Sequence, residues 1–133
     1  MGLISGIRLI RIDEDMSVTE VPFRWVNKNP FKSIYFAVLS MAAELSTAAP
    51  VIMALKGLEV NVAFIIVGLK ADFSKKAQSK ITFTCKDYVA INDVISQLSK
   101  PGDTAMVTAE TIAHDLSGEE VARFYFTWSL KVR

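Results

Sequence analysis

Hydrophobic and polar residues alternate along several short segments of the chain, which is typical of half-buried strands. Residues 6–12 and 16–25 show this pattern on either side of the acidic break at 13–15, and together they predict a β-hairpin. Residues 80–86 alternate most clearly, with Ile81, Phe83 and Cys85 on the inward side. Further strands are predicted over 60–72, 105–115 and 121–132, and a hairpin turn at 116–119 joins the last two.

Two segments have helical periodicity instead. The first runs from about Phe31 to Lys56, and Pro50 inside it predicts a kink or a restart of the helix. The second is short and amphipathic, because its apolar residues follow the spacing i, i+3, i+4, i+7: Ile91, Val94, Ile95 and Leu98.

The long helix is apolar on nearly all sides, so it must be surrounded rather than laid on a surface. A long antiparallel sheet wrapped around it achieves this, and subunit contacts can bury the remaining apolar surface. We therefore predict one α+β domain over residues 1–133, in which the sheet encloses a long central helix. The length of 133 residues and the 51% of hydrophobic residues fit one such core.

Composition excludes several classes of function. A formal net charge of +1 argues against a nucleic-acid surface, which needs an excess of basic residues. The chain has one Cys and one His, which excludes a disulfide framework and metal sites built from several such ligands. We expect Cys85 to lie in the core and His114 on the surface.

Residues 34–55 are apolar over a length that can span a bilayer. Glu44 at the centre of this stretch and Pro50 within it argue against a membrane span. Arg8 and Arg11 interrupt the apolar N-terminus, which argues against a secretory signal. We therefore expect a soluble cytoplasmic protein.

Glu44 is the main candidate for chemistry. At 100° per residue, its side of the helix carries a narrow polar seam of Ser33, Ser40 and Thr47. A carboxylate is costly to bury unless it is paired or takes part in a reaction, and desolvation makes it a stronger base. Two alternatives are that Glu44 faces solvent on a half-exposed helix, or that it forms a structural salt bridge with Arg24 or Arg123.

The order of elements and the helical segment 33–48, with its mid-helix acid, carry a resemblance. So do segment 72–77, Asp-Phe-Ser-Lys-Lys-Ala, and segment 115–122, Asp-Leu-Ser-Gly-Glu-Glu-Val-Ala. The chain resembles the hotdog-fold acyl-CoA thioesterase superfamily, especially its uncharacterised thioesterase-like branch. The resemblance implies a homodimer or dimer of dimers with the acyl-thioester site between subunits.

The same resemblance assigns roles to residues. It makes Glu44 the catalytic base or nucleophile, and Asn27 or Asn29 the residue that orients water or substrate. Backbone N–H groups near Lys32 and Ser33 would polarise the thioester carbonyl, as the free N–H groups of a helix N-terminus can.

Other residues are candidates for binding the substrate. Ser40 and Thr47 share the helical face of Glu44, and Lys75 and Lys76 are candidates for the phosphates of coenzyme A, or else belong to a solvated charged surface. No metal and no cofactor is expected, since coenzyme A enters only as part of the substrate.

Three functions are consistent with the sequence. The first is hydrolysis of an acyl-CoA or related thioester. The second is a non-catalytic module that binds acyl or lipid-like ligands, which is favoured because Phe31-Lys32-Ser33 stands where many active members have a Gly-rich segment. The third is a purely structural oligomer.

Overall fold

The structure is a computed structural model, and it describes residues 6–23 and 36–133. The described elements follow the predicted order of strands and helices closely. In chain order they are β1 (Arg8–Ile12), β2 (Ser17–Val21), α2 (Phe36–Leu55), β3 (Val62–Phe73), β4 (Ile81–Cys85), α3 (Tyr88–Ile95), β5 (Thr104–His114) and β6 (Glu120–Val132).

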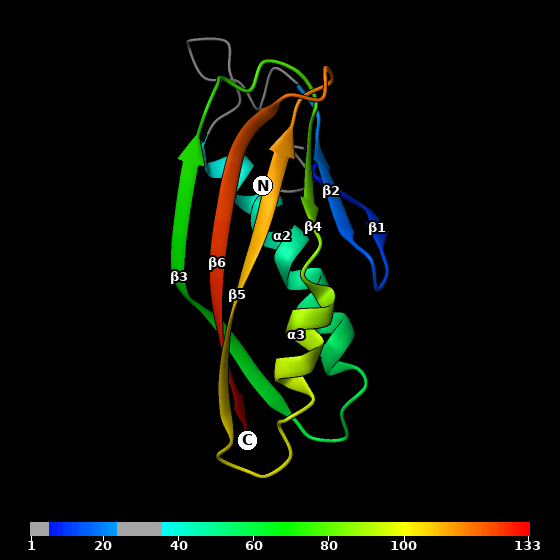
Figure 1. Cartoon of the computed structure of the whole chain (residues 1–133), viewed down its shortest axis with the longest axis vertical. Helices are drawn as coiled ribbons and strands as arrows, with labels where there is room; N and C mark the ends of the chain where they lie inside the picture. Colours follow the sequence, from blue (N-terminus) through cyan, green and yellow to red (C-terminus); the bar gives the residue numbers. More distant parts are fainter. Residues whose placement is uncertain (1–5, 24–35) are drawn as a thin grey trace.

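The strands form one six-stranded sheet in the order β1-β2-β4-β5-β6-β3, as far as the described residues show. Every neighbouring pair is antiparallel. The sheet curves past one side of α2, with β3 at one edge and β1 at the other (Figure 1). This arrangement confirms the predicted α+β fold with an antiparallel sheet around a central helix.

The core lies between α2 and the concave side of the sheet. The alternation in β4 is confirmed, since Ile81, Phe83 and Cys85 are buried and the residues between them are half-buried. Burial raises the pKa of the Cys85 thiol to about 11, so this cysteine is an inert core residue. The inward residues of β6 are at most 4% exposed: Phe124, Phe126, Trp128, Leu130 and Val132.

The central helix continues through Pro50 from Phe36 to Leu55, so the chain does not restart there. Pro50 is itself buried and has no N–H to donate to the carbonyl of Ser46. Ala42 and Ala43, both 0% exposed, let the sheet approach the helix backbone closely.

Within the described part of the chain, α2 is the one helix long and apolar enough to cross a bilayer. Its buried residues pack against β2, β4, β5 and β6. The apolar stretch that raised the question of a membrane span is therefore the core helix of the domain.

A substitution of Phe124 tests the packing of this core. Its ring lies 5.6 Å from that of Phe73, 5.8 Å from that of Phe83 and 6.0 Å from that of Phe126, measured between centroids. We expect Phe124→Ala to lower the free energy of unfolding by about 3–5 kcal/mol because it leaves a cavity. Met106→Ala, at a side chain that is 60% exposed, should change it by less than about 0.5 kcal/mol. Denaturant unfolding of both variants measures the difference, and equal losses would contradict the core described here.

Candidate functional site

Glu44 lies on the side of α2 that the sheet leaves uncovered, and its side chain is exposed in the single chain. It forms no hydrogen bond or ion pair through its carboxylate with any residue of 6–23 or 36–133. The predicted desolvated carboxylate is therefore not present in one chain alone. Arg123 is bonded to Glu110 and Glu120 instead, so the alternative of a structural salt bridge between Glu44 and Arg123 is wrong. Arg24 lies outside the described residues.

The surroundings of Glu44 on this face are almost entirely apolar. A helix face that remains in water is normally rich in polar residues. Here Phe36 is 53% exposed and Ile52 is 43% exposed, and no other charged residue lies within α2. The remaining exposed or half-buried residues of this face are Ala37, Met41, Leu45, Ala48 and Leu55. Such a face has the composition of a contact surface.

The predicted polar seam divides into two parts. Ser40 lies one turn before Glu44, and its Oγ atom is buried without a hydrogen-bond partner among the described residues. Thr47 is 0% exposed; its hydroxyl donates to the Glu44 carbonyl (3.0 Å) and accepts from Trp128 Nε1 (3.2 Å). Ser40 thus has a buried hydroxyl without a partner among the described residues, whereas the hydroxyl of Thr47 both donates and accepts inside the protein.

The other predicted catalytic groups lie outside the described residues. They are Asn27 and Asn29, and also Lys32 and Ser33, near which backbone N–H groups are expected to polarise the carbonyl. Their roles stay predictions.

A second uncovered apolar surface adjoins the first at edge strand β3. Leu69 pairs with Phe126 and Phe73 pairs with Ala122, so both point to the concave side of the sheet. They are nevertheless 50% and 49% exposed, because α2 lies over the other strands. The ring of Phe73 lies 5.5 Å from that of Phe36 on α2. We call the exposed face of α2 together with Leu69 and Phe73 the α2–β3 surface.

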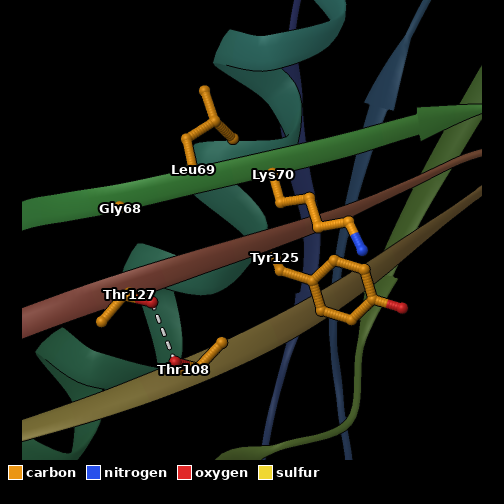
Figure 2. A pocket seen from close by; sticks show the side chains of 6 residues that line it. All are labelled: Gly68, Leu69, Lys70, Thr108, Tyr125 and Thr127. Atoms are coloured by element: carbon orange, nitrogen blue, oxygen red, sulfur yellow. Dashed lines mark hydrogen bonds between the residues drawn. The ribbon is translucent and has the colours of Figure 1, made fainter.

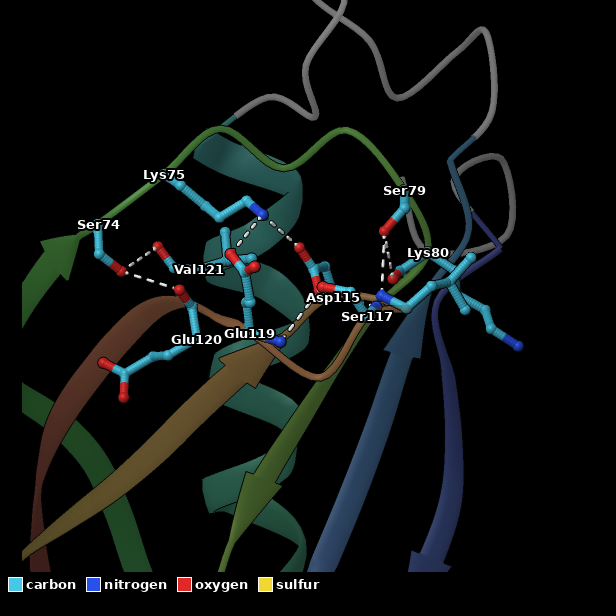
Figure 3. A network of polar contacts seen from close by, with 10 residues as sticks. Ser74, Lys75, Ser79, Lys80, Asp115, Ser117, Glu119, Glu120 and Val121 are labelled. Atoms are coloured by element: carbon cyan, nitrogen blue, oxygen red, sulfur yellow. Dashed lines mark hydrogen bonds and ion pairs between the residues drawn. The ribbon is translucent and has the colours of Figure 1, made fainter.

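The two predicted phosphate-binding lysines follow β3. Lys75 Nζ lies 2.8 Å from a carboxylate oxygen of Asp115 and 2.9 Å from one of Glu119 (Figure 3). The bond to Lys75, followed by that from Ser117, holds the pKa of Asp115 well below its usual range. Lys75 therefore ties the segment after β3 to the β5–β6 turn, and two carboxylates compensate its charge. Lys76 is exposed beside it.

A shallow hollow of about 330 Å³ lies on the convex face of the sheet, away from α2 (Figure 2). Lys70 Nζ lies 5.7 Å from the centroid of the Tyr125 ring, and the hydroxyls of Thr108 and Thr127 are 2.8 Å apart. Gly68 leaves this space open, since a Cβ there would lie 3.3 Å from Cβ of Thr127. The sequence patterns do not predict the hollow, although a glycine within a strand is a signal for a bulge or a close approach.

An apolar groove of about 350 Å³ lies between β1 and the C-terminal half of α2. It is lined by Leu9, Ile12, Leu45, Ala49, Ile52, Met53 and Lys56. Its helical residues lie roughly 80–180° around the axis from Glu44, at 100° per residue. Leu45 and Ile52 also belong to the exposed face around Glu44, so the groove begins at the margin of that face and continues away from the carboxylate.

No protein-family model and no curated protein matches the sequence. Solved structures do match its fold. A Pseudomonas aeruginosa protein of unknown function, described as a probable thioesterase, has a TM-score of 0.79 at 21% identity over 98% of this chain and 86% of its own. A Chlorobaculum tepidum protein of unknown function has a TM-score of 0.84 at 12% identity over 99% and 86%. A Haemophilus influenzae thioesterase has a TM-score of 0.71 at 15% identity over 98% and 82%. The chain has the hotdog fold.

The network around Lys75 makes stability depend on pH. The pKa of Asp115 is lowered in the folded state, so the carboxylate stabilises the fold above its unfolded pKa of about 4, and this stabilisation is lost as pH falls further. We expect Asp115→Asn to lower the melting temperature at pH 7, with the difference from wild type shrinking below about pH 4. Asp15→Asn, at an exposed turn residue, is the matched control. A difference that stays constant down to pH 2.5 would show that the charge of Asp115 does not act in this way.

Proposed function

We propose that this protein hydrolyses an acyl-CoA or a related acyl thioester, with Glu44 as the reactive carboxylate. The observation that supports this most is the position of Glu44, the one charged side chain of the central helix, on an otherwise apolar uncovered face. The thioesterases among the similar structures support the class of reaction.

The proposed chemistry needs few groups. As a general base, Glu44 takes a proton from a water molecule while the water oxygen attacks the thioester carbonyl, and the thiolate then leaves. As a nucleophile, the Glu44 carboxylate attacks the thioester carbonyl and displaces the thiolate, and water then hydrolyses the resulting mixed anhydride in a second step. The Ser40 hydroxyl, which has no hydrogen-bond partner among the described residues, is the proposed donor to the substrate. Asn27 or Asn29, with the N–H groups near Lys32 and Ser33, complete the proposed site.

We propose that a second copy of the chain covers Glu44. The two edge strands of the sheet differ, and their differences favour docking of the second copy at β3. Edge strand β1 has five residues, two of them arginines, Arg8 and Arg11. Edge strand β3 has twelve residues and no charge from Val62 to Leu69. Both edge strands have one irregularity in their pairing, so length and charge are what distinguish them. A long apolar edge with unpaired backbone groups is a template for pairing with another chain, whereas charges protect an edge.

Pairing of β3 with β3 of a second copy would extend the sheet and bring the partner over the α2–β3 surface. Glu44 would then be desolvated between subunits, and the apolar residues around it would line a site for an acyl chain. This explains why the carboxylate is exposed in one chain. A cytoplasmic location completes the proposal, since acyl-CoA is found there.

The second candidate is a binding protein for acyl or lipid-like ligands without turnover. It is favoured by the absence of any group that orients the Glu44 carboxylate among residues 6–23 and 36–133. A catalytic base is normally held in place by a hydrogen-bonding partner. A ligand retained through purification, together with no thiol release, would support this candidate.

The first experiment measures thiol release from a panel of acyl-CoAs. Glu44→Gln keeps the shape of the side chain but cannot accept the proton, so we expect kcat to fall by about 100-fold or more. Glu59→Gln, at an exposed residue just after α2, should leave the rate unchanged. Wild-type turnover in the Glu44→Gln variant would rule out Glu44 as base or nucleophile.

The second experiment tests the assembly. Leu69→Asp places a charge on the α2–β3 surface, so we expect the dimer to dissociate and the activity to disappear with it. Leu116→Asp, in the β5–β6 turn at a residue that is 72% exposed, is the matched control and should change neither. Light scattering after size-exclusion chromatography measures the mass. A Leu69→Asp variant that remains dimeric would place the interface elsewhere.

A further inference from the structure

Three buried hydroxyls bond three successive backbone carbonyls of α2. Thr19 Oγ1 donates to the carbonyl of Ala42 (2.8 Å), Ser46 Oγ to that of Ala43 (2.7 Å), and Thr47 Oγ1 to that of Glu44 (3.0 Å). All three residues are 0% exposed, so water does not compete for these bonds.

Each hydroxyl also links the helix to a different strand. Thr19 belongs to β2, and the Ser46 hydroxyl is hydrogen-bonded to that of Thr111 on β5 (2.7 Å). The Thr47 hydroxyl accepts from Trp128 Nε1 on β6 (3.2 Å). Hydrogen bonds within the helix alone would leave α2 able to rotate and slide against an apolar sheet. The directional hydrogen bonds to the strands prevent both movements.

The hydrogen bonds of Thr47 are the ones that hold the helical turn that contains Glu44. Thr47 donates its single hydroxyl proton to the Glu44 carbonyl and accepts the indole N–H, so its bonds leave little freedom to reorient. The Trp128 ring is itself packed 5.6 Å from the ring of Phe64, a residue of edge strand β3. The chain of contacts therefore runs from β3 through Trp128 and Thr47 to the backbone of Glu44.

We propose that Thr47 and Trp128 are positioning residues that set where the Glu44 carboxylate stands relative to edge strand β3. This inference rests on the proposed function, in which a second copy docks at β3 and Glu44 reacts at the junction. Helical periodicity made Thr47 a candidate for substrate binding. In this proposal it acts instead through the backbone carbonyl of Glu44. Because small displacements of a reacting group are costly, loss of this bond should affect the reaction step more than substrate binding.

The helix supplies its own control. Ser46 makes the same kind of buried hydroxyl-to-carbonyl bond one residue earlier, but to Ala43, which is buried and carries no reactive group. Thr47→Val removes the Thr47 hydroxyl at nearly constant volume, Thr47→Ser keeps it, and Ser46→Ala removes the neighbouring one. A general loosening of the helix should follow from either deletion, whereas displacement of Glu44 should follow from Thr47→Val alone.

The experiment measures kcat and KM for acyl-CoA hydrolysis by the three variants. We expect Thr47→Val to lower kcat about tenfold with KM nearly unchanged, Thr47→Ser to restore the wild-type rate, and Ser46→Ala to keep it. Trp128→Phe removes the N–H donor but keeps an aromatic ring, so it tests the same link if Thr47→Val does not fold. Equal losses of kcat in Thr47→Val and Ser46→Ala would overturn the positioning role.

A second measurement does not depend on activity. The carbonyl ¹³C resonance of Glu44, recorded by NMR, should move in Thr47→Val and stay in place in Ser46→Ala. An unmoved resonance in Thr47→Val overturns the inference whatever the enzyme does. If wild type releases no thiol from any acyl-CoA while this resonance moves as expected, the proposed function fails and the link from Thr47 to Glu44 stands.

Discussion

The fold depends on the need to cover a helix that is apolar on nearly every side. The sheet does this for the side of α2 that carries Ala42, Ala43 and the other buried residues. The opposite side stays open in one chain, although Phe36 and Ile52 gain nothing from contact with water. Edge strand β3 is uncharged from Val62 to Leu69, which leaves a second apolar region open to a packing partner. The same requirement therefore links the architecture, the proposed assembly and the position of Glu44.

Close packing of α2 on the sheet also explains why polar residues occur inside the core. Small side chains bring the helix backbone near the strands, and its carbonyls then need partners that water cannot supply. The inward positions of β2 accordingly include Thr19, whose hydroxyl donates to the Ala42 carbonyl, as well as Val21. The hydroxyls of Thr19, Ser46 and Thr47 make the contact directional, which a purely apolar interface of alanines does not. The helix is held at one rotation, and that rotation places Glu44 on the open face.

Most of the fold was predictable because its signals are local. The alternation in β4 and β6 and the apolar spacing of α3 identify elements and their buried faces without tertiary information. The environment of Glu44 was not predictable, because periodicity gives the residues that share a helical face but not which face the sheet covers. The same limit applies to Thr47 and Lys75, whose partners Trp128, Asp115 and Glu119 lie far away in the sequence.

The charges of the described residues narrow where the proposed thioester substrate can bind. Lys75 is compensated by two carboxylates, and Lys70 lies on the convex face of the sheet, so neither faces Glu44 with a free positive charge. The groove beside β1 begins at the margin of the face of Glu44 and continues away from the carboxylate. In the proposed function, the acyl part of the substrate therefore lies on the α2–β3 surface, which has no opposite wall in a single chain. A second copy on this surface would remove water from around Glu44, and the reactivity of the carboxylate would then depend on the proposed assembly.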